Sequence, residues 1–272
     1  MQVRNNLLFN DDNSPVDFRG SPNRGGTVNP QYLVIHYTAG ANFESACKSL
    51  LDPNAKASTH IVIGRGGEVA QLVPFDAVAW HAGVSRWHGL EGLNQHSLGI
   101  ELDNAGRLTR VNGTWRSWFA RTYDDSEVLE AAHKYEKNAS GWHVFTPQQL
   151  DTAIAVARLL VHTYNLRDVI GHDDIAPGRK VDPGPAFPMD SFRSRVIGRE
   201  RETIEVFEAT TDVNLRSGPG TAHEKVVPGP LRRGTRMKLH SREGSWCYVD
   251  VLNADGRADA NGWVYGDYIK PT

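Results

Sequence analysis

The chain is poor in cysteine and has no long apolar run. Its 272 residues include only Cys47 and Cys247, too few and too far apart for a disulfide framework, so both are expected to be buried free thiols. No run approaches the roughly 20 apolar residues that span a membrane, so no transmembrane segment is expected. The first residues also lack the charged-then-apolar profile of a secretory signal peptide, so a cytoplasmic location is the default unless a leader has been removed.

Neither sign of charge is in excess, and apolar residues are somewhat scarce. The chain carries 30 basic and 32 acidic residues, whereas proteins that hold nucleic acid usually show a basic excess, so no nucleic-acid partner is expected. The hydrophobic fraction of 39% is a little low for a compact enzyme. Residues 1–30, polar and rich in Asn, Asp, Gly and Pro, explain part of that and are expected to form an irregular segment.

From residue 31 onward the apolar pattern predicts strands and helices. The expected strands cover residues 33–38, 60–63, 68–73 and 97–102. Helical spacing predicts a short helix from Phe43 to Leu51, stopped by Asp52-Pro53. A longer helix is expected to begin with a capping box formed by Thr146 and Gln149. Its buried stripe is predicted to be Leu150, Ile154, Ala157, Val161 and Tyr164.

Two regions depart from this pattern. Residues 104–143 combine many charges with large aromatic residues and no clean period, and we expect an ordered insertion with some helix over 125–137. Its aromatic side chains suit core or lid packing or, as the alternative, sugar binding. Beyond a linker at 198–202, short β-rich pieces separated by Gly and Pro clusters predict a small barrel over residues 203–272.

Candidate chemistry is concentrated in three places. His36 lies near the end of the first expected strand, His172 lies in a Gly-His-Asp-Asp segment, and Asp182 stands before Pro-Gly-Pro, a stiff turn. Two imidazoles and one carboxylate are a common ligand set for catalytic zinc, which leaves a fourth position for water. Zinc lowers the pKa of that water to about 7, which makes it a nucleophile near neutral pH. The spacing alone is a weak signal, because most histidines in a chain with eleven are structural.

Four ordered segments are far more specific together than any of them alone. They are Val-Ile-His-Tyr-Thr (34–38), Ala-Trp-His-Ala-Gly-Val-Ser (79–85), Ser-Leu-Gly-Ile-Glu-Leu (97–102) and residues 171–185. Over roughly residues 32–192, apart from the insertion, the chain resembles the type 2 N-acetylmuramoyl-L-alanine amidases, and most strongly the bacterial wall-recycling amidases. The resemblance implies an α/β fold, with a mixed central β-sheet flanked by helices, for a catalytic domain over residues 31–199.

The resemblance also implies roles for individual residues. It implies a zinc ligand set of His36, His172 and Asp182. Hydrolysis of the amide bond between N-acetylmuramic acid and L-alanine is then expected, with Glu101 as the base for zinc-bound water and Lys180 stabilising the oxyanion. Trp80 and His81 match a segment that lines the substrate cleft in relatives.

Simpler interpretations stand beside these roles. Glu101 could be a solvent-facing carboxylate, Lys180 an exposed charge, and His81 a hydrogen-bond donor in a packed loop. Other histidines, His133 among them, are expected to be structural or exposed. The alternative function is a non-catalytic peptidoglycan-binding or sensing protein, although such relatives typically lack a metal ligand. A zinc peptidase is disfavoured because the sequence has no His-Glu-x-x-His signature.

The C-terminal region has a resemblance of its own. Residues 212–220, 244–249 and 262–269 resemble a bacterial SH3 domain, which implies a small all-β barrel over residues 203–272. In wall enzymes such domains often bind peptidoglycan peptides and tether the enzyme to its substrate; the alternative is a domain that only packs on the catalytic unit. The expected partner is therefore peptidoglycan or a muropeptide. Intact wall and soluble anhydromuropeptide both stay open as substrates, and action at the wall or periplasm would need a removed leader or release by a phage.

Overall fold

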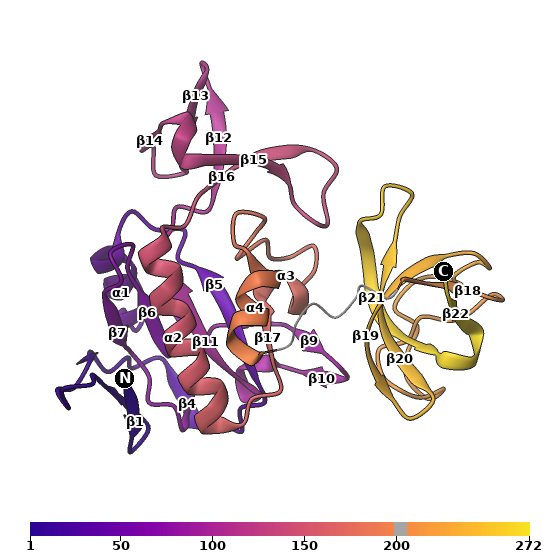
Figure 1. The fold of residues 1–272 in the computed structure, drawn as a ribbon, viewed down its shortest axis with the longest axis horizontal. Helices are drawn as coiled ribbons and strands as arrows, with labels where there is room; N and C mark the ends of the chain where they lie inside the picture. The colour runs from indigo at the N-terminus through magenta and orange to yellow at the C-terminus, as the bar shows by residue number, and fades with distance from the viewer. Residues whose placement is uncertain (199–205) are drawn as a thin grey trace. The chain divides into compact units, whose positions relative to one another are not determined.

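The computed structural model describes residues 1–198 and 206–272, which divide into two compact units (Figure 1). One unit comprises residues 1–85 and 91–199, and the other comprises residues 86–90 and 200–272. Each has an apolar core of its own, which includes Leu33 and Ile100 in the first unit and Val249 in the second. The expected linker at 198–202 lies, after residue 198, outside the described residues.

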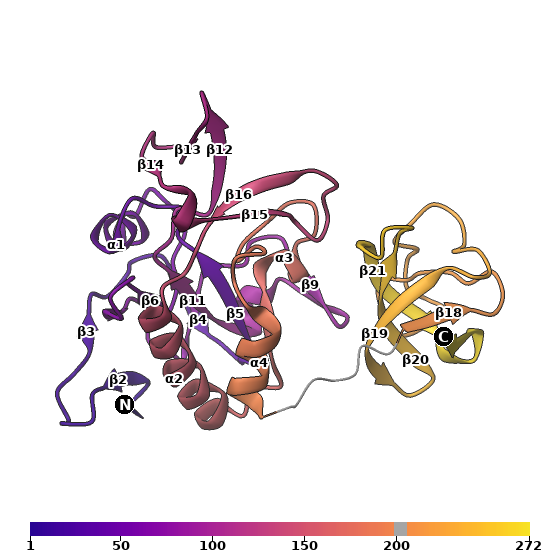
Figure 2. The ribbon, with the colours of Figure 1, turned by 45° about the horizontal axis from the view of Figure 1, so that its top comes forward.

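A six-stranded mixed sheet runs through the first unit (Figures 1 and 2). Its strands, in spatial order, are β17 (Asp168–Gly171), β5 (Tyr32–Tyr37), β11 (Ser97–Leu102), β6 (Ile61–Ile63), β7 (Val69–Gln71) and β3 (Asp17–Phe18). The first four run parallel to one another, whereas β6 and β7 form an antiparallel hairpin. This confirms the predicted α/β class with a mixed central sheet.

Helices cover both faces of this sheet. They are α1 (Phe43–Leu51), α2 (Pro147–Tyr164), α3 (His172–Ile175) and α4 (Met189–Ile197). On β6, Ile61 and Ile63 belong to the core that includes Ile154 of α2, whereas Val62 packs with Cys47 of α1. Because successive side chains of a strand point to opposite faces, α1 and α2 lie on opposite sides of the sheet.

The start of α2 differs from the expected capping box. Thr146 accepts a hydrogen bond from the Gln149 N–H at 3.1 Å, as predicted. The Gln149 side chain does not return that bond but donates to the carbonyl oxygens of Ile63 and Asp103, both at 3.0 Å. These bonds place the Gln149 side chain among the buried residues of the helix. The helix therefore buries Gln149, Ala153, Ile154, Val156, Ala157 and Leu160, while Leu150, Val161 and Tyr164 of the predicted stripe are half-buried.

The first thirty residues were expected to be irregular but carry short strands. These are β1 (Gln2–Arg4), β2 (Leu7–Phe9), β3 and β4 (Arg24–Thr27), the last paired with β8 (Ala77–Ala79). Leu8 is 1% exposed, and its N–H donates to the Gln71 side chain at 2.8 Å. The segment is ordered by pairing with distant parts of the chain, which short-range sequence patterns do not reveal.

The insertion forms an antiparallel sheet rather than a partly helical excursion. Its strands, in spatial order, are β14 (Thr122–Tyr123), β13 (Thr114–Arg116), β12 (Arg107–Val111), β16 (Ala139–His143) and β15 (Val128–Ala132). The helix expected over 125–137 is wrong: one 3-10 turn, η2 (Asp125–Glu127), leads directly into β15. Pairing of β15 with β16 buries Trp142, which is 1% exposed. The stabilisation from this cross-strand pairing outweighs the local preference of these residues for a helix.

Two short strands, β9 (Arg86–Trp87) and β10 (Leu90–Glu91), and the 3-10 turn η1 (Leu93–Gln95) complete the elements before the insertion. The second unit is all-β, as predicted. Its elements are β18 (Val206–Ala209), β19 (Arg236–Glu243), β20 (Trp246–Leu252), β21 (Ala258–Tyr265), η3 (Gly266–Tyr268) and β22 (Ile269–Pro271). Residues 213–215 form no strand, and Val213 makes an isolated bridge to Leu231.

The two cysteines are in the state that the sequence predicts. Cys47 and Cys247 are both buried free thiols. None of the helices within residues 1–198 and 206–272 has the length and apolar character needed to cross a membrane.

Candidate metal centre

Three neighbouring parallel strands end at the same edge of the sheet and place the expected site residues there. Glu101 of β11 is the register partner of His36 on β5, and Gly171 of β17 is the partner of Ile35. His172, which follows Gly171, therefore lies beside His36. Paired residues on parallel strands face the same side, so the side chains of Glu101 and His36 share one face. The carboxyl ends of parallel strands are where α/β sheets commonly bind ligands.

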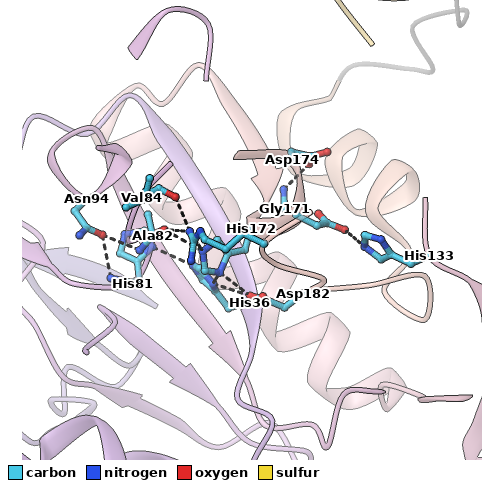
Figure 3. Close-up of polar contacts among 12 residues, drawn as sticks. His36, His81, Ala82, Val84, Asn94, His133, Gly171, His172, Asp174 and Asp182 are labelled. Carbon is cyan, nitrogen blue, oxygen red and sulfur yellow. Dashed lines mark hydrogen bonds and ion pairs between the residues drawn. The ribbon is translucent and has the colours of Figure 1, made fainter. Parts of the chain in front are cut away.

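Three side-chain atoms converge at this edge (Figure 3). His36 Nδ1 lies 2.9 Å from His172 Nδ1 and 2.9 Å from Asp182 Oδ2, and His172 Nδ1 lies 2.9 Å from the same Oδ2. The three residues are buried, with exposed fractions of 1%, 3% and 8%. Among the described residues, no other group of three His, Cys, Asp or Glu side chains brings its ligand atoms within 4.8 Å of one another.

The second nitrogen of each ring indicates which nitrogen can bind a metal. His172 Nε2 lies 3.0 Å from the backbone oxygen of Ala82, and because a carbonyl only accepts, Nε2 carries the hydrogen and Nδ1 keeps its lone pair. His36 Nε2 lies 3.0 Å from His81 Nδ1 and can donate in the same way. Two lone pairs and a carboxylate oxygen directed at one point repel each other without a cation. This donor set fits zinc, with the other ring nitrogens held by neighbouring groups.

The surroundings favour the protonation states that bind a metal. Burial, and after it the nearby His172, lowers the pKa of His36 to about 4, so the ring is neutral near physiological pH. Burial by itself raises the pKa of Asp182, but close contacts with His172 and His36 outweigh it and bring that pKa below its usual value. Neutral imidazoles and an ionised carboxylate are the forms that coordinate metals.

The charges of Glu101 and Lys180 interact with those of the converging residues. Burial, and then the Asp182 charge, raises the pKa of Glu101 well above its usual range, while Lys180 opposes that rise. Glu101 is half-buried, and its Oε2 is buried and has no hydrogen-bond partner within the described residues. An unpartnered buried oxygen is unusual in folded proteins and is consistent with a group that meets substrate or water. Lys180 is half-buried, and its charge also lowers the pKa of His36.

The two expected substrate-binding residues differ in exposure. Trp80 is 36% exposed, whereas His81 is 8% exposed. His81 contacts His36 through Nδ1, and its Nε2 lies 3.4 Å from Ser97 Oγ. The ring also lies against the backbone of Gly99, where an added Cβ would come within 2.7 Å of His81 Cγ. His81 thus supports one ring of the ligand cluster from behind.

Two residues that sequence reasoning missed hold the 80–85 loop. Asn94 Oδ1 accepts hydrogen bonds from the N–H groups of His81 and Ala82 at 3.0 and 2.7 Å. Arg179 Nη2 donates to the carbonyl oxygens of Ala82 and Val84 at 2.8 and 2.6 Å. Their partners are mostly backbone atoms distant in sequence, so no local motif marks them.

Comparison with known proteins gives two family matches and several relatives. A family model described as N-acetylmuramoyl-L-alanine amidase matches residues 26–185, and one described as bacterial SH3 domain matches residues 211–270. The chain is 34% identical over 175 residues to the N-acetylmuramoyl-L-alanine amidase AmiD of Escherichia coli (strain K12), covering 61% of this chain and 53% of AmiD. The chain thus spans about half the length of AmiD.

A second relative is covered more fully. The chain is 32% identical over 183 residues to the 1,6-anhydro-N-acetylmuramyl-L-alanine amidase AmpD of the same strain, covering 60% of this chain and 81% of AmpD. The crystal structure of a selenomethionine derivative of AmpD matches with a TM-score of 0.50 and 30% identity, covering 72% of this chain and 99% of that chain.

Proposed function

The chain belongs to the N-acetylmuramoyl-L-alanine amidase family, and from that membership we propose zinc-dependent hydrolysis of the amide between N-acetylmuramic acid and L-alanine in peptidoglycan or its fragments. The observation that carries the proposal is the convergence of His36 Nδ1, His172 Nδ1 and Asp182 Oδ2 at mutual distances of 2.9 Å. The relatives AmiD and AmpD are both named as amidases of this bond, and the name of AmpD specifies the 1,6-anhydro form. That name supports a soluble muropeptide among the substrates.

The proposed chemistry divides between the metal and two side chains. His36, His172 and Asp182 would hold zinc, which would supply a Lewis acid for the scissile carbonyl and would lower the pKa of water to about 7. Glu101 Oε2 accepts a proton from the attacking water, and its raised pKa suits it to pass that proton to the leaving L-alanine amine. Lys180 places a positive charge beside the developing oxyanion.

Trp80 and His81 have different roles in the proposed mechanism. The half-exposed indole of Trp80 offers an apolar surface to the sugar or peptide. His81, in contact with His36, acts on substrate only through the ligand that it orients. Loss of Trp80 should therefore raise KM, whereas loss of His81 should weaken zinc binding.

The second unit is proposed to bind wall peptides. Tyr248 and Trp263 are buried in its core, with exposed fractions of 3% and 1%. Trp246, Tyr265 and Tyr268 instead line a pocket of about 410 Å³, together with Asp212 and other residues. Aromatic walls with a few polar groups are typical of peptide-binding pockets, and tethering at this pocket would raise the local substrate concentration.

Mass spectrometry of the reaction products tests the proposed activity. Purified protein is incubated with anhydromuropeptide and with insoluble sacculi, each with and without a zinc chelator. Release of intact stem peptide with a free L-alanine amine, abolished by chelator and restored by zinc, is the expected result. Absence of peptide release from both substrates would instead favour a non-catalytic peptidoglycan-binding protein.

A further inference from the structure

The insertion reaches the short helix that carries His172 through charged side chains, and Figure 3 shows His133 of the insertion pointing toward this helix. His133 Nε2 lies 3.0 Å from Asp173 Oδ2, and Lys134 Nζ lies 2.9 Å from Asp173 Oδ1. Lys134 also pairs with Asp174. The side chains of His133 and Asp173 are only 2% and 7% exposed, so their contact is shielded from water.

The two aspartates are in turn tied to the backbone of the metal ligands. Asp173 follows His172 directly, and its N–H donates to the carbonyl oxygen of Asp182 at 2.8 Å. Asp174 Oδ2 accepts from the N–H of Gly171, the residue before His172, at 2.7 Å. The backbone of Asp173 therefore joins the His172 turn to Asp182, and the carboxylate of Asp174 joins it to Gly171, so a shift of either residue moves the backbone beside a ligand.

A second contact brings the insertion against the other ligand segment. Trp142 of β16 packs so closely on Gly184, two residues after Asp182, that an added Cβ would lie 2.7 Å from the indole. The Trp142 Nε1–H is held by the carbonyl oxygen of Ala131 at 2.9 Å, which fixes the ring within the insertion. The insertion thus supports both chain segments that supply ligands after the sheet.

We propose that His133 and Lys134 are positioning residues that hold the His172 turn in the geometry that binds zinc, and that this support is a function of the insertion. The inference rests on the proposed zinc-dependent function. Buried charges are costly unless each finds its partner, so removal of either residue leaves Asp173 short of a partner and free to shift. Groups that orient metal ligands from outside the coordination sphere typically change metal affinity about 10- to 100-fold when they are replaced.

Zinc affinity of the full chain tests this role separately from turnover. His133→Ala and Lys134→Ala remove the contacts, His133→Gln and Lys134→Arg keep a donor, and Arg116→Gln removes an exposed charge from β13 of the same insertion as the control. Zinc dissociation constants are measured by competition with a chromophoric chelator, and the absorption spectrum of the cobalt-loaded protein reports the ligand geometry. Circular dichroism establishes that each variant is folded at the assay temperature.

We expect the two alanine variants to bind zinc about 10- to 100-fold more weakly with an altered cobalt spectrum. The two conservative variants should recover most of that loss, and Arg116→Gln should match the wild type. Folded alanine variants with wild-type zinc affinity and spectrum would overturn the proposal, leaving the cluster a purely structural contact. If an alanine variant does not fold, Asp174→Asn takes its place, because it removes a charged partner of Lys134 at nearly constant volume. Weaker zinc binding with an altered cobalt spectrum is again the expected result, and wild-type affinity and spectrum would overturn the proposal. A wild-type chain that binds no zinc would instead refute the proposed function itself.

Discussion

Replacing Glu101 by glutamine isolates the proposed base from the metal site. Glutamine matches glutamate in size, but its amide cannot accept a proton near neutral pH. The packing around β11 is therefore kept while the base is lost. Glu101 is not among the three converging ligands, so zinc should bind this variant as it binds the wild type. The variant therefore separates metal binding from proton transfer.

The size of the effect follows from the role. Loss of a positioned general acid–base group slows turnover by about 10²- to 10⁴-fold, which corresponds to roughly 3–5 kcal/mol of transition-state stabilisation. The wild-type rate should rise with pH through the pKa of Glu101, because only the ionised form can accept a proton. Burial and Asp182 raise that pKa in the metal-free site, whereas bound zinc favours the ionised form; the rise should in either case be absent from the residual activity of Glu101→Gln.

The pH dependence of the stability of the metal-free protein gives an independent check on the raised pKa of Glu101. The folded state favours the neutral form of Glu101, since its pKa there is raised above the unfolded value. This contribution to stability is present below the unfolded pKa and is lost as the pH rises through the folded pKa. In thermal melts at pH values between the unfolded and the folded pKa of Glu101, the Tm of the wild type should fall as the pH rises. The fall should be smaller in Glu101→Gln.

The assays are steady-state cleavage of a muropeptide across pH, zinc content by atomic emission, and melting of the chelated protein. Normal turnover in a zinc-loaded Glu101→Gln variant would refute the role of Glu101. Low turnover accompanied by lost zinc would show instead that Glu101 supports the metal site and is not the base.

The remaining predictions concern the metal ligand, its support, the second unit and the core. His36→Ala removes a ligand, so both zinc content and peptide release should vanish; activity without zinc would contradict the ligand assignment. His81→Ala should weaken zinc binding about 10- to 100-fold in chelator competition, because its ring holds His36 Nε2, and an unchanged affinity would make it a packing residue. Trp246→Ala should weaken binding to sacculi in a pull-down more than it slows cleavage of a small muropeptide, and equal losses would indicate a stabilising role. Ile100→Ala in the fully buried sheet core should lower the free energy of unfolding by about 2–5 kcal/mol in urea titrations.

Sequence patterns predicted the strands that position the site because those strands are buried and strongly patterned. The alternation over residues 97–102 already puts Glu101 on the face opposite Ile100, and the run at 33–38 carries His36 near its end. The register between these strands could not be read from either run. It depends on pairing between residues that are 65 positions apart in the chain, and it is what makes Glu101 and His36 neighbours.

The insertion was misread in part because its pattern is dominated by charge. Residues 128–132 have no clean alternation, and their strand is stabilised by pairing with β16 and by packing on Trp142. His133 follows that strand and was expected to be structural or exposed. Its partner, Asp173, lies 40 residues away in the chain, so only the folded structure brings the two together.

The support around the ligands was also beyond local reasoning. His81 stays a predicted residue of the substrate cleft, and its contact with His36 could not be read from its segment. Contacts of this kind depend on the path of a loop and not on residue spacing. The chemistry-bearing residue types could be recognised in the sequence, whereas the groups that orient them could not.

Hydrolysis in heavy-oxygen water tests the central claim most directly. The wild-type chain is incubated with a defined muropeptide in water enriched in oxygen-18, and the two products are separated and weighed by mass spectrometry. If the amide between N-acetylmuramic acid and L-alanine is cleaved, one heavy oxygen appears in the lactyl carboxylate of the sugar product and none in the peptide. A label in a peptide carboxylate, or no labelled product with zinc present, would contradict the account.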